Sequence, residues 1–314
     1  MRVLVVSNMA VSAAAPQRGS FVRDQVAALR RLGCEVDAYD WQPGSSNYAP
    51  AVRALRRRLR ERSYDVVHAH YGLAGWCASL AGADPLVVTF HGTDVRHRAV
   101  GPLSRLLCRR GILIAAASRA LFAPEAGRPG LPLVPGRSAV LPSGAELTRF
   151  EPLDRGEARR RLGLRADGRY LLFPADPARP VKRVDRARRV AELAEADLLC
   201  LGAVEPGDVS LHINAAAAVL ITSDNEGFGL AAVEALACGV PILSTPVGVV
   251  PHLARGLEGC LVAPFDADSF AAAARRLLDG AELRLAAHRR SVAFGADRTA
   301  ERVLAAYQDV AGIA

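Results

Sequence analysis

Short apolar runs alternate with amphipathic stretches along the amino-terminal half of the 314-residue chain. The apolar runs are residues 1–8, 34–40, 65–72, 85–94, 112–118 and 138–146. After the first run, residues 21–33 place apolar side chains at helical spacing, and Gly33 ends the pattern. Strands connected through helices form parallel sheets, because a parallel connection has to cross back over the sheet. The pattern therefore predicts an α/β, doubly wound fold.

The carboxy-terminal half repeats this alternation. Predicted strands cover residues 170–173, 197–202, 215–224, 241–247 and 259–263. Predicted helices cover residues 184–196, 230–238, 266–280 and 299–313. A chain of this length forms about two domains, so we expect two parallel-sheet domains.

The composition fits two α/β domains, and it also bears on where in the cell the protein is found. Hydrophobic residues make up 51% of the chain and aromatic residues 5%, which suits a core rich in Ala, Val and Leu. No apolar run approaches the roughly 20 residues that span a bilayer, and the short first run predicts a buried strand and not a signal peptide. The six cysteines lack metal-ligand spacing, so we expect no metal site, reduced thiols and a cytoplasmic location.

The net charge of +8 is distributed unevenly. Residues 1–152 hold 20 arginines and 11 acidic residues, a net charge of +9, whereas residues 153–314 carry −1. Much of the excess lies in the helical segment 53–62. This segment is favoured as a solvated crossover helix, and peripheral contact with an anionic membrane at the inner face stays open. Nucleic acid is disfavoured, because no aromatic residues interleave with the basic run.

The most informative segment is 223–241, with the sequence SDNEGFGLAAVEALACGVP. Glu226 and Glu234 lie eight positions apart across a glycine-rich turn from a strand into a helix, which at helical rise is about 12 Å. Gly227 and Gly229 allow close approach of a ligand to the backbone. Solvated acids at a helix end are the alternative interpretation.

The turn into this helix also predicts an anion site. Unpaired N–H groups at a helix start favour a phosphate, and here they belong to Phe228, Gly229 and Leu230. One glutamate could then bind sugar hydroxyls and the other a ribose diol, with a diphosphate between them.

Lys182 is the sole lysine among the 40 basic residues. An ammonium is compact, whereas guanidinium is a broad planar fork, so a narrow diphosphate pocket distinguishes the two. Lys182 follows a predicted strand and a proline-rich loop, which places it at the carboxyl edge of a sheet, where open α/β sheets bind ligands. A surface lysine without a specific role is the alternative.

Three histidines follow predicted strands of the first half. His91 comes at a strand end before Gly92, so its ring is expected at a ligand site; a core histidine is the alternative. His68 and His70 share one strand face, but no third ligand follows at metal spacing, so we expect them to be structural. Tyr71 and Asp94 are candidates on the acceptor side from their position.

The Glu-x7-Glu spacing, the EGFGL turn and the following CGVPILSTPVGVVPHL together resemble the retaining GT-B glycosyltransferases of family 4, over nearly the whole chain. The resemblance implies two Rossmann-like domains facing a cleft. The segment LPSGAELTRFEP is similar to the family's hinge, with Ser143 and Glu146 in place of Asn and Asp. It implies an acceptor domain at 1–152, a donor domain at 153–295, and a final helix at 296–314 that returns to the first domain.

The resemblance also implies roles for particular residues in the donor domain. Glu226 would face the transferred hexose and Glu234 would hold the ribose. Lys182 and an arginine would neutralise the leaving diphosphate; Arg179 is preferred and Arg183 is a rival, since Ala175-Asp176 stands where the family has Gly-Arg.

In the first domain, the resemblance assigns backbone amides of a glycine loop to the donor diphosphate. The segment GSFVRDQ matches that loop, with Gly19 permitting a tight turn and Ser20 expected to cap the helix. The resemblance assigns His91 to the transferred sugar, where it helps to stabilise positive charge at the anomeric carbon.

The resulting expectation is a metal-independent hexosyl transfer with retention, from a nucleoside diphosphate sugar to an unidentified small-molecule or lipid-linked acceptor, with no cofactor. A glycosidase that works by double displacement would need two carboxylates about 5 Å apart. The wider spacing expected for Glu226 and Glu234 disfavours that reaction. The one Asp-x-Asp match, at 266–268, lies in a late turn away from the other motifs, so we do not expect it to hold a metal. No GxGxxG follows a predicted strand, which disfavours a nicotinamide dehydrogenase. A GT-B nucleotide-sugar epimerase and a non-catalytic nucleotide-sugar-binding subunit remain the alternatives.

Overall fold

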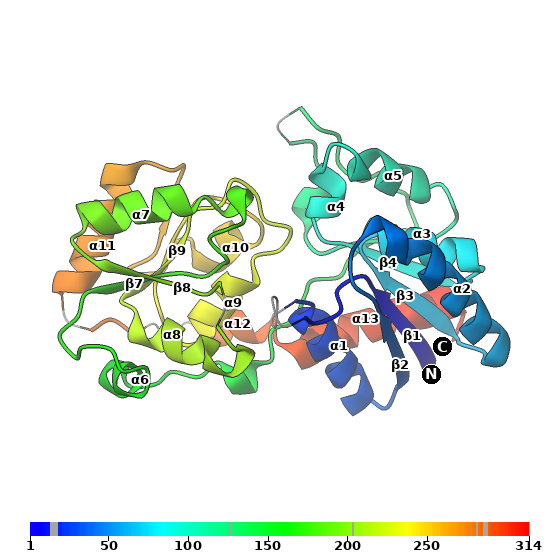
Figure 1. Ribbon diagram of the computed structural model, residues 1–314, viewed down its shortest axis with the longest axis horizontal. Helices are drawn as coiled ribbons and strands as arrows, with labels where there is room; N and C mark the ends of the chain where they lie inside the picture. Colours follow the sequence, from blue (N-terminus) through cyan, green and yellow to red (C-terminus); the bar gives the residue numbers. More distant parts are fainter. Residues whose placement is uncertain (13–17, 126, 203, 281, 285–287, 314) are drawn as a thin grey trace. The chain divides into compact units, whose positions relative to one another are not determined.

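A computed structural model describes residues 1–12, 18–125, 127–202, 204–280, 282–284 and 288–313. These residues form two compact units. The first comprises the described residues of Met1–Ala13, Arg18–Gly144 and Ala296–Ala314, and the second includes those of Ala145–Gly295. Each unit is built on its own parallel sheet, as the alternation of elements predicted, so the α/β fold is confirmed (Figure 1).

The first unit contains a six-stranded parallel sheet in the order β2-β1-β3-β4-β5-β6. Its strands are β1 (Arg2–Ser7), β2 (Glu35–Asp40), β3 (Val66–His70), β4 (Leu86–Phe90), β5 (Leu113–Ala116) and β6 (Ser138–Val140). Its helices are α1 (Ser20–Arg31), α2 (Ser45–Glu61), α3 (Gly72–Ala81), α4 (Thr93–Arg96), α5 (Val100–Leu107) and α13 (Ala296–Ala311), with a 3-10 turn at Arg119–Phe122. The apolar strands β3 and β4 are buried along their whole length, as parallel strands covered on both faces are.

The second unit contains a five-stranded parallel sheet in the order β11-β10-β9-β7-β8. Its strands are β7 (Tyr170–Phe173), β8 (Asp197–Cys200), β9 (Ala218–Ile221), β10 (Ile242–Ser244) and β11 (Leu261–Val262). Its helices are α6 (Arg155–Arg161), α7 (Val184–Leu193), α8 (Val209–Ala215), α9 (Leu230–Ala237), α10 (Val250–Ala254), α11 (Ala267–Asp279) and α12 (His288–Val292). Short 3-10 turns cover Leu147–Arg149, Pro180–Lys182 and Pro206–Asp208.

Two sequence-based boundaries differ from the structure. The predicted strand 215–224 is too long: Ala215 ends α8, and β9 covers only Ala218–Ile221. The predicted domain boundary near Pro152 also lies too late, because the first unit ends at Gly144. Residues 151–153 already belong to the second unit, since the Asn214 side chain donates to the Glu151 carbonyl and accepts from the Leu153 N–H.

The last helix packs on the first sheet. Val303 and Tyr307 of α13 lie in the same buried cluster as Val3 and Val5 of β1. The Tyr307 hydroxyl is 2.6 Å from Nδ1 of His68, so the aromatic ring fills the core while its polar end is satisfied. Across the described residues, no helix combines the length and the apolarity that crossing a bilayer requires.

Replacing Tyr307 separates these two contributions. Tyr307→Phe keeps the buried ring and removes the hydroxyl, while Gln25 still lies 3.2 Å from the same nitrogen of His68. We expect the free energy of unfolding, measured by urea denaturation, to fall by about 1 kcal/mol. Tyr307→Ala also leaves a cavity and should cost about 3 kcal/mol or more. Equal losses in the two variants would contradict a packing role for this helix.

Candidate functional site

The carboxyl ends of β7 and β9 position the two charged residues that the sequence singled out in the second half. Lys182 ends the 3-10 turn that follows β7, and Glu226 lies in the loop that follows β9. The two strands are parallel neighbours, with Leu171 opposite Ala218. Both connections therefore leave the sheet at the same edge, the usual ligand-binding edge of an open α/β sheet.

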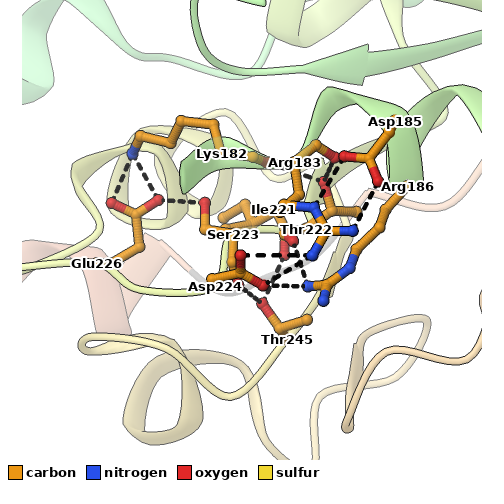
Figure 2. A network of polar contacts seen from close by, with 10 residues as sticks. All are labelled: Lys182, Arg183, Asp185, Arg186, Ile221, Thr222, Ser223, Asp224, Glu226 and Thr245. Carbon is orange, nitrogen blue, oxygen red and sulfur yellow. Dashed lines mark hydrogen bonds and ion pairs between the residues drawn. The ribbon is translucent and has the colours of Figure 1, made fainter. Parts of the chain in front are cut away.

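Lys182 and Glu226 form a bidentate ion pair. The Lys182 Nζ lies 2.6 Å from each carboxylate oxygen of Glu226 (Figure 2). The side chains are only 15% and 12% exposed, so solvent screens the pair weakly. Ser223 donates from Oγ to the same carboxylate at 2.7 Å. The site thus holds a partly desolvated ammonium against a carboxylate whose direction is fixed by a hydroxyl.

Side chains behind the ion pair tie the two loops together. Oγ1 of Thr222 lies 3.2 and 2.9 Å from the carbonyl oxygens of Lys182 and Arg183. The Asp224 N–H donates to the Val181 carbonyl at 2.9 Å, and Oγ1 of Thr245 at the end of β10 lies 2.7 Å from the Ser223 carbonyl. The positions of Lys182 and Glu226 are therefore set by backbone contacts as well as by their own charges.

The two candidate arginines differ in their surroundings. Arg183 is bound to both oxygens of Asp185 and lies 3.2 Å from Asp224, which also pairs with Arg186 (Figure 2). These carboxylates raise the pKa of Arg183, because they stabilise its charged form. Arg179 is exposed, and its guanidinium forms no hydrogen bond or ion pair within the described part of the chain. Of the two, only Arg179 is thus available to a new anion without giving up a carboxylate.

Helix α9 begins later than the spacing of the glutamates suggested. Its first residue is Leu230, and Gly229 precedes it with a left-handed φ of 100°. Glu226 lies outside the helix, so the separation of about 12 Å from Glu234, which assumed helical rise throughout, was wrong. Glu234 is half-buried in the second turn of α9. Within the described residues, the N–H groups of Phe228, Gly229 and Leu230 have no acceptor.

A neighbouring loop supports this turn. The Val249 N–H donates to the Phe228 carbonyl at 2.7 Å. Gly248 has a φ of 53°, and a Cβ there would lie 2.2 Å from the same carbonyl oxygen. Gly227 and Gly229 thus form a turn that is held from behind, while its N–H groups keep their donor capacity.

In the first unit, the loops after β3 and β4 meet at Asp94. Its carboxylate accepts from the N–H groups of His91 (2.9 Å), Gly92 (3.0 Å) and Gly72 (3.0 Å). Asp94 is 4% exposed, and this burial raises its pKa to about 6, against the opposing effect of the three N–H groups. Asp94 therefore organises the backbone on both sides of His91, a role its sequence position alone did not reveal.

The three histidines form one cluster. Nδ1 of His70 is 3.0 Å from Nε2 of His91, and the His68 and His70 ring centroids are 4.4 Å apart. Burial lowers the pKa of all three, in the case of His70 to about 3. The rings are therefore neutral near pH 7. The alternating His68 and His70, followed by His91 at the end of the next strand, were the sequence signal for this contact.

At the start of α1, one expectation was wrong. Gly19, with a φ of 67°, is the residue before the helix, and Ser20 is the first helical residue. Among the described residues, no side chain caps this end. A Cβ on Gly19 would lie 2.8 Å from the Met9 carbonyl oxygen, so the turn requires glycine for space as well as for conformation. Residues 13–17, which precede this turn, lie outside the described part of the chain.

Comparisons with known proteins agree with this architecture. Residues 182–291 match the family model described as glycosyl transferases group 1, and residues 11–126 match the glycosyltransferase family 4 model. A D-inositol 3-phosphate glycosyltransferase of Geodermatophilus obscurus is 34% identical over 78% of this chain and 66% of its own length. The chain belongs to glycosyltransferase family 4. A relative of the same name from Actinosynnema mirum is 33% identical over 83% of this chain and 76% of its own length.

Solved structures show that this family 4 chain has the GT-B fold. A sucrose-phosphate synthase from Thermosynechococcus elongatus matches with a TM-score of 0.71 and 18% identity, over 99% of both chains. HepE from Anabaena, solved in complex with UDP and glucose, matches with the same TM-score and 17% identity, over 98% of this chain and 99% of its own. The prediction of a GT-B fold is confirmed.

The role of Asp94 leads to a stability prediction with a defined pH dependence. In Asp94→Asn, the amide replaces one acceptor oxygen and leaves a buried N–H unpaired, so we expect a loss of about 1–3 kcal/mol at pH 5. The raised pKa means that the wild-type carboxyl stabilises the fold fully below pH 4 and loses this contribution as the pH rises through about 6. The variant lacks this titration.

The measurement is urea denaturation of both proteins at pH 5 and pH 7.5. The difference between wild type and Asp94→Asn should be larger at pH 5. Asp268→Asn, at an exposed position in α11, serves as the control and should stay within about 0.5 kcal/mol of wild type. Wild-type stability in Asp94→Asn at pH 5 would contradict the role of the carboxylate.

Proposed function

We propose that this glycosyltransferase moves a hexose-type sugar from a nucleoside diphosphate sugar to an acceptor hydroxyl, with retention of anomeric configuration and without a metal ion. The observation that carries the proposal is the Lys182–Glu226 pair at the carboxyl edge of the second sheet, 2.6 Å from Nζ to each oxygen. Beside it in the chain lie the unpaired N–H groups at the start of α9. HepE, which shares the fold, was solved with UDP and glucose, and this supports a uridine nucleotide as the first donor to test.

Each of the donor-binding groups binds a different part of the nucleoside diphosphate sugar. The N–H groups of Phe228, Gly229 and Leu230, at the positive end of the α9 dipole, bind the diphosphate. Glu226 accepts from the sugar hydroxyls, and Glu234 accepts from the ribose diol. The proposal also includes the amides around Gly19 and Ser20 among the groups that bind a diphosphate.

Catalysis rests on stabilising the leaving group. As the bond between the anomeric carbon and the diphosphate oxygen breaks, negative charge grows on the phosphate, where the positive charges of Lys182 and Arg179 stabilise it. The acceptor oxygen forms its bond to the anomeric carbon on the same face, and its proton passes to the departing phosphate oxygen. Fixed cations and N–H groups thus supply the charge stabilisation for which other enzymes use a metal.

The names of the relatives suggest which acceptor to test first. The two relatives from Geodermatophilus obscurus and Actinosynnema mirum are named D-inositol 3-phosphate glycosyltransferases. D-inositol 3-phosphate is therefore the first acceptor to test, with UDP-glucose and other nucleoside diphosphate sugars as donors.

Turnover should depend on the shape of the cation at position 182. Lys182→Arg replaces a compact ammonium with a broad planar guanidinium, which can still pair with the Glu226 carboxylate but cannot place its charge at the position of Nζ. We expect a loss of about 100- to 1,000-fold in kcat, as for removal of one preorganised donor to developing charge. The assay measures release of nucleoside diphosphate on addition of acceptor, in the presence of EDTA, and NMR gives the anomeric configuration of the product.

Arg189→Lys is the matched control, because Arg189 is exposed and, of the residues that the structure describes, pairs only with Glu192 on the surface of α7. It should retain wild-type turnover. A change in the sugar configuration of the donor without an acceptor, and without release of nucleoside diphosphate, would indicate an epimerase instead. Donor binding without turnover in wild type would indicate a non-catalytic subunit, and an inverted product would exclude retention.

We also propose that the first unit contacts an anionic membrane at its cytoplasmic face. Four residues form the α3–α5 apolar patch: Trp76, Leu80, Leu103 and Leu106. The leucines are 51%, 44% and 47% exposed in that order, and Trp76 Nε1 donates to the Leu103 carbonyl at 3.0 Å. Exposed apolar residues beside an aromatic ring with a satisfied N–H suit the interface between headgroups and acyl chains.

Arginines border this patch. The Arg56 guanidinium of α2 donates to the Leu80 carbonyl at 2.8 Å, and that of Arg110 lies 5.9 Å from the centre of the Trp76 ring. Helical spacing places Arg53 and Arg60 on the same side of α2 as Arg56. An apolar centre with an arginine border complements negatively charged lipid, each arginine contributing about 1 kcal/mol.

Binding to vesicles tests this contact. We expect the protein to co-sediment with phosphatidylcholine vesicles containing phosphatidylglycerol, and less so at high salt. Leu106→Glu should weaken binding about tenfold or more, because one apolar insertion is lost and a negative charge is added. Val292→Glu, at a 37% exposed position of the second unit, adds the same charge as a control. Equal binding to neutral vesicles would contradict the role of charge.

A further inference from the structure

Within the described residues, the histidine cluster contains a fully buried nitrogen without a hydrogen-bond partner. His70 is fully buried, its Nδ1 lies 3.0 Å from Nε2 of His91, and its own Nε2 has no hydrogen-bond partner in the described structure. His68 lies two residues earlier on the same strand. Both of its ring nitrogens have hydrogen-bond partners: Gln25 and Tyr307 at Nδ1, and Thr89 at Nε2. The geometry of His70 therefore restricts where its proton can be.

A hydrogen bond between two neutral imidazoles requires one donor and one acceptor, and so permits two arrangements. If His91 donates from Nε2, Nδ1 of His70 accepts, and the His70 proton sits on the buried, unpaired Nε2. If His70 donates from Nδ1, only a lone pair stays unpaired at its Nε2. Orphaned buried N–H groups are rarer in native proteins than under-satisfied acceptors, so the second arrangement is favoured.

We propose that His70 is a positioning residue that donates from Nδ1 and thereby holds His91 in the tautomer with its proton on Nδ1. Nδ1 of His91 makes no hydrogen bond within the described residues, so this tautomer presents an uncharged N–H donor to a ligand. Such a donor recognises a sugar oxygen as acceptor. This inference rests on the proposed function, which assigns His91 to the transferred sugar.

Packing around His91 makes the tautomer the main remaining freedom of its ring. The ring contacts Phe21, with centroids 4.7 Å apart, and Tyr71, with centroids 4.8 Å apart. It stacks on His70 at 5.2 Å, and the backbone N–H of His91 is held by Asp94. The ring plane is thus fixed by neighbours on several sides, and His70 is the group that selects which nitrogen carries the hydrogen.

Nitrogen-15 NMR of the histidine rings tests the proposal without any substrate. In wild type, we expect His91 to show a protonated Nδ1 and an unprotonated Nε2, with the signals assigned by their loss in His91→Gln. His70→Asn places an amide donor near the position of Nδ1 and should keep this tautomer. His70→Leu removes the donor and should let His91 exchange its proton between the two nitrogens.

Turnover should follow the tautomer. His70→Leu is expected to lower kcat about 10- to 100-fold, the usual cost of losing a partner that orients a site histidine, and His70→Asn should recover most of this loss. His68→Gln is the control for a structural effect in the same cluster. It can lower the melting temperature but should leave the His91 tautomer unchanged.

A wild-type His91 protonated at Nε2, or an unchanged tautomer in His70→Leu, would overturn the proposal. If His70→Leu fails to fold, the wild-type spectrum alone decides. Because the spectrum requires neither donor nor acceptor, an enzyme with the expected tautomer but no transferase activity would refute the proposed function and leave the positioning role of His70 intact.

Discussion

The candidate site of the second unit rests on two opposite charges, each of which stabilises the other in a largely buried position. An ammonium and a carboxylate at 15% and 12% exposure lose much of their hydration, and only a close bidentate contact with added hydrogen bonds offsets that loss. Ser223 supplies such a bond. The pair stabilises the loops and, under the proposed function, keeps both groups ready for the donor. A diphosphate would take over the ammonium, and sugar hydroxyls would satisfy the carboxylate.

Parallel topology explains why residues 44 positions apart meet so closely. Neighbouring parallel strands end at one edge, so the connections after β7 and β9 are adjacent before any side chain interacts. Thr222 and Thr245 then fix the loops through carbonyl oxygens, independently of the charges. Removal of the charge at 182 therefore changes the site's electrostatics more than its framework, and so turnover is the informative measurement.

Sequence patterns predicted the parts that depend on strand order, and failed where local geometry decides. The apolar runs located both sheets, and Lys182 was correctly placed after a strand at the sheet edge. The direct contact with Glu226 was not predicted, because spacing along the chain says nothing about the direction of two loops. Glu226 was counted as part of a helical rise, although the left-handed Gly229 delays the helix to Leu230.

Similar local causes explain the other differences. Serine is a residue type that often caps a helix, but here Gly19, with its left-handed backbone, occupies the cap position before Ser20. The alanine run before β9 suits a buried strand as well as a buried helix end, and only tertiary packing assigns Ala215 to α8. Asp94 was a candidate by position, yet its contacts with three N–H groups arise from two loops that meet only in the folded sheet.

The proposed reaction makes two different electrostatic demands. The leaving diphosphate gains negative charge, for which the second unit offers an ammonium and helix N–H groups. The anomeric carbon gains positive charge, and a cationic imidazole beside it would raise the barrier. Burial and mutual proximity keep His68, His70 and His91 neutral, so the first unit can donate a hydrogen bond without adding charge. The environment of the histidine cluster therefore disfavours protonation of its rings.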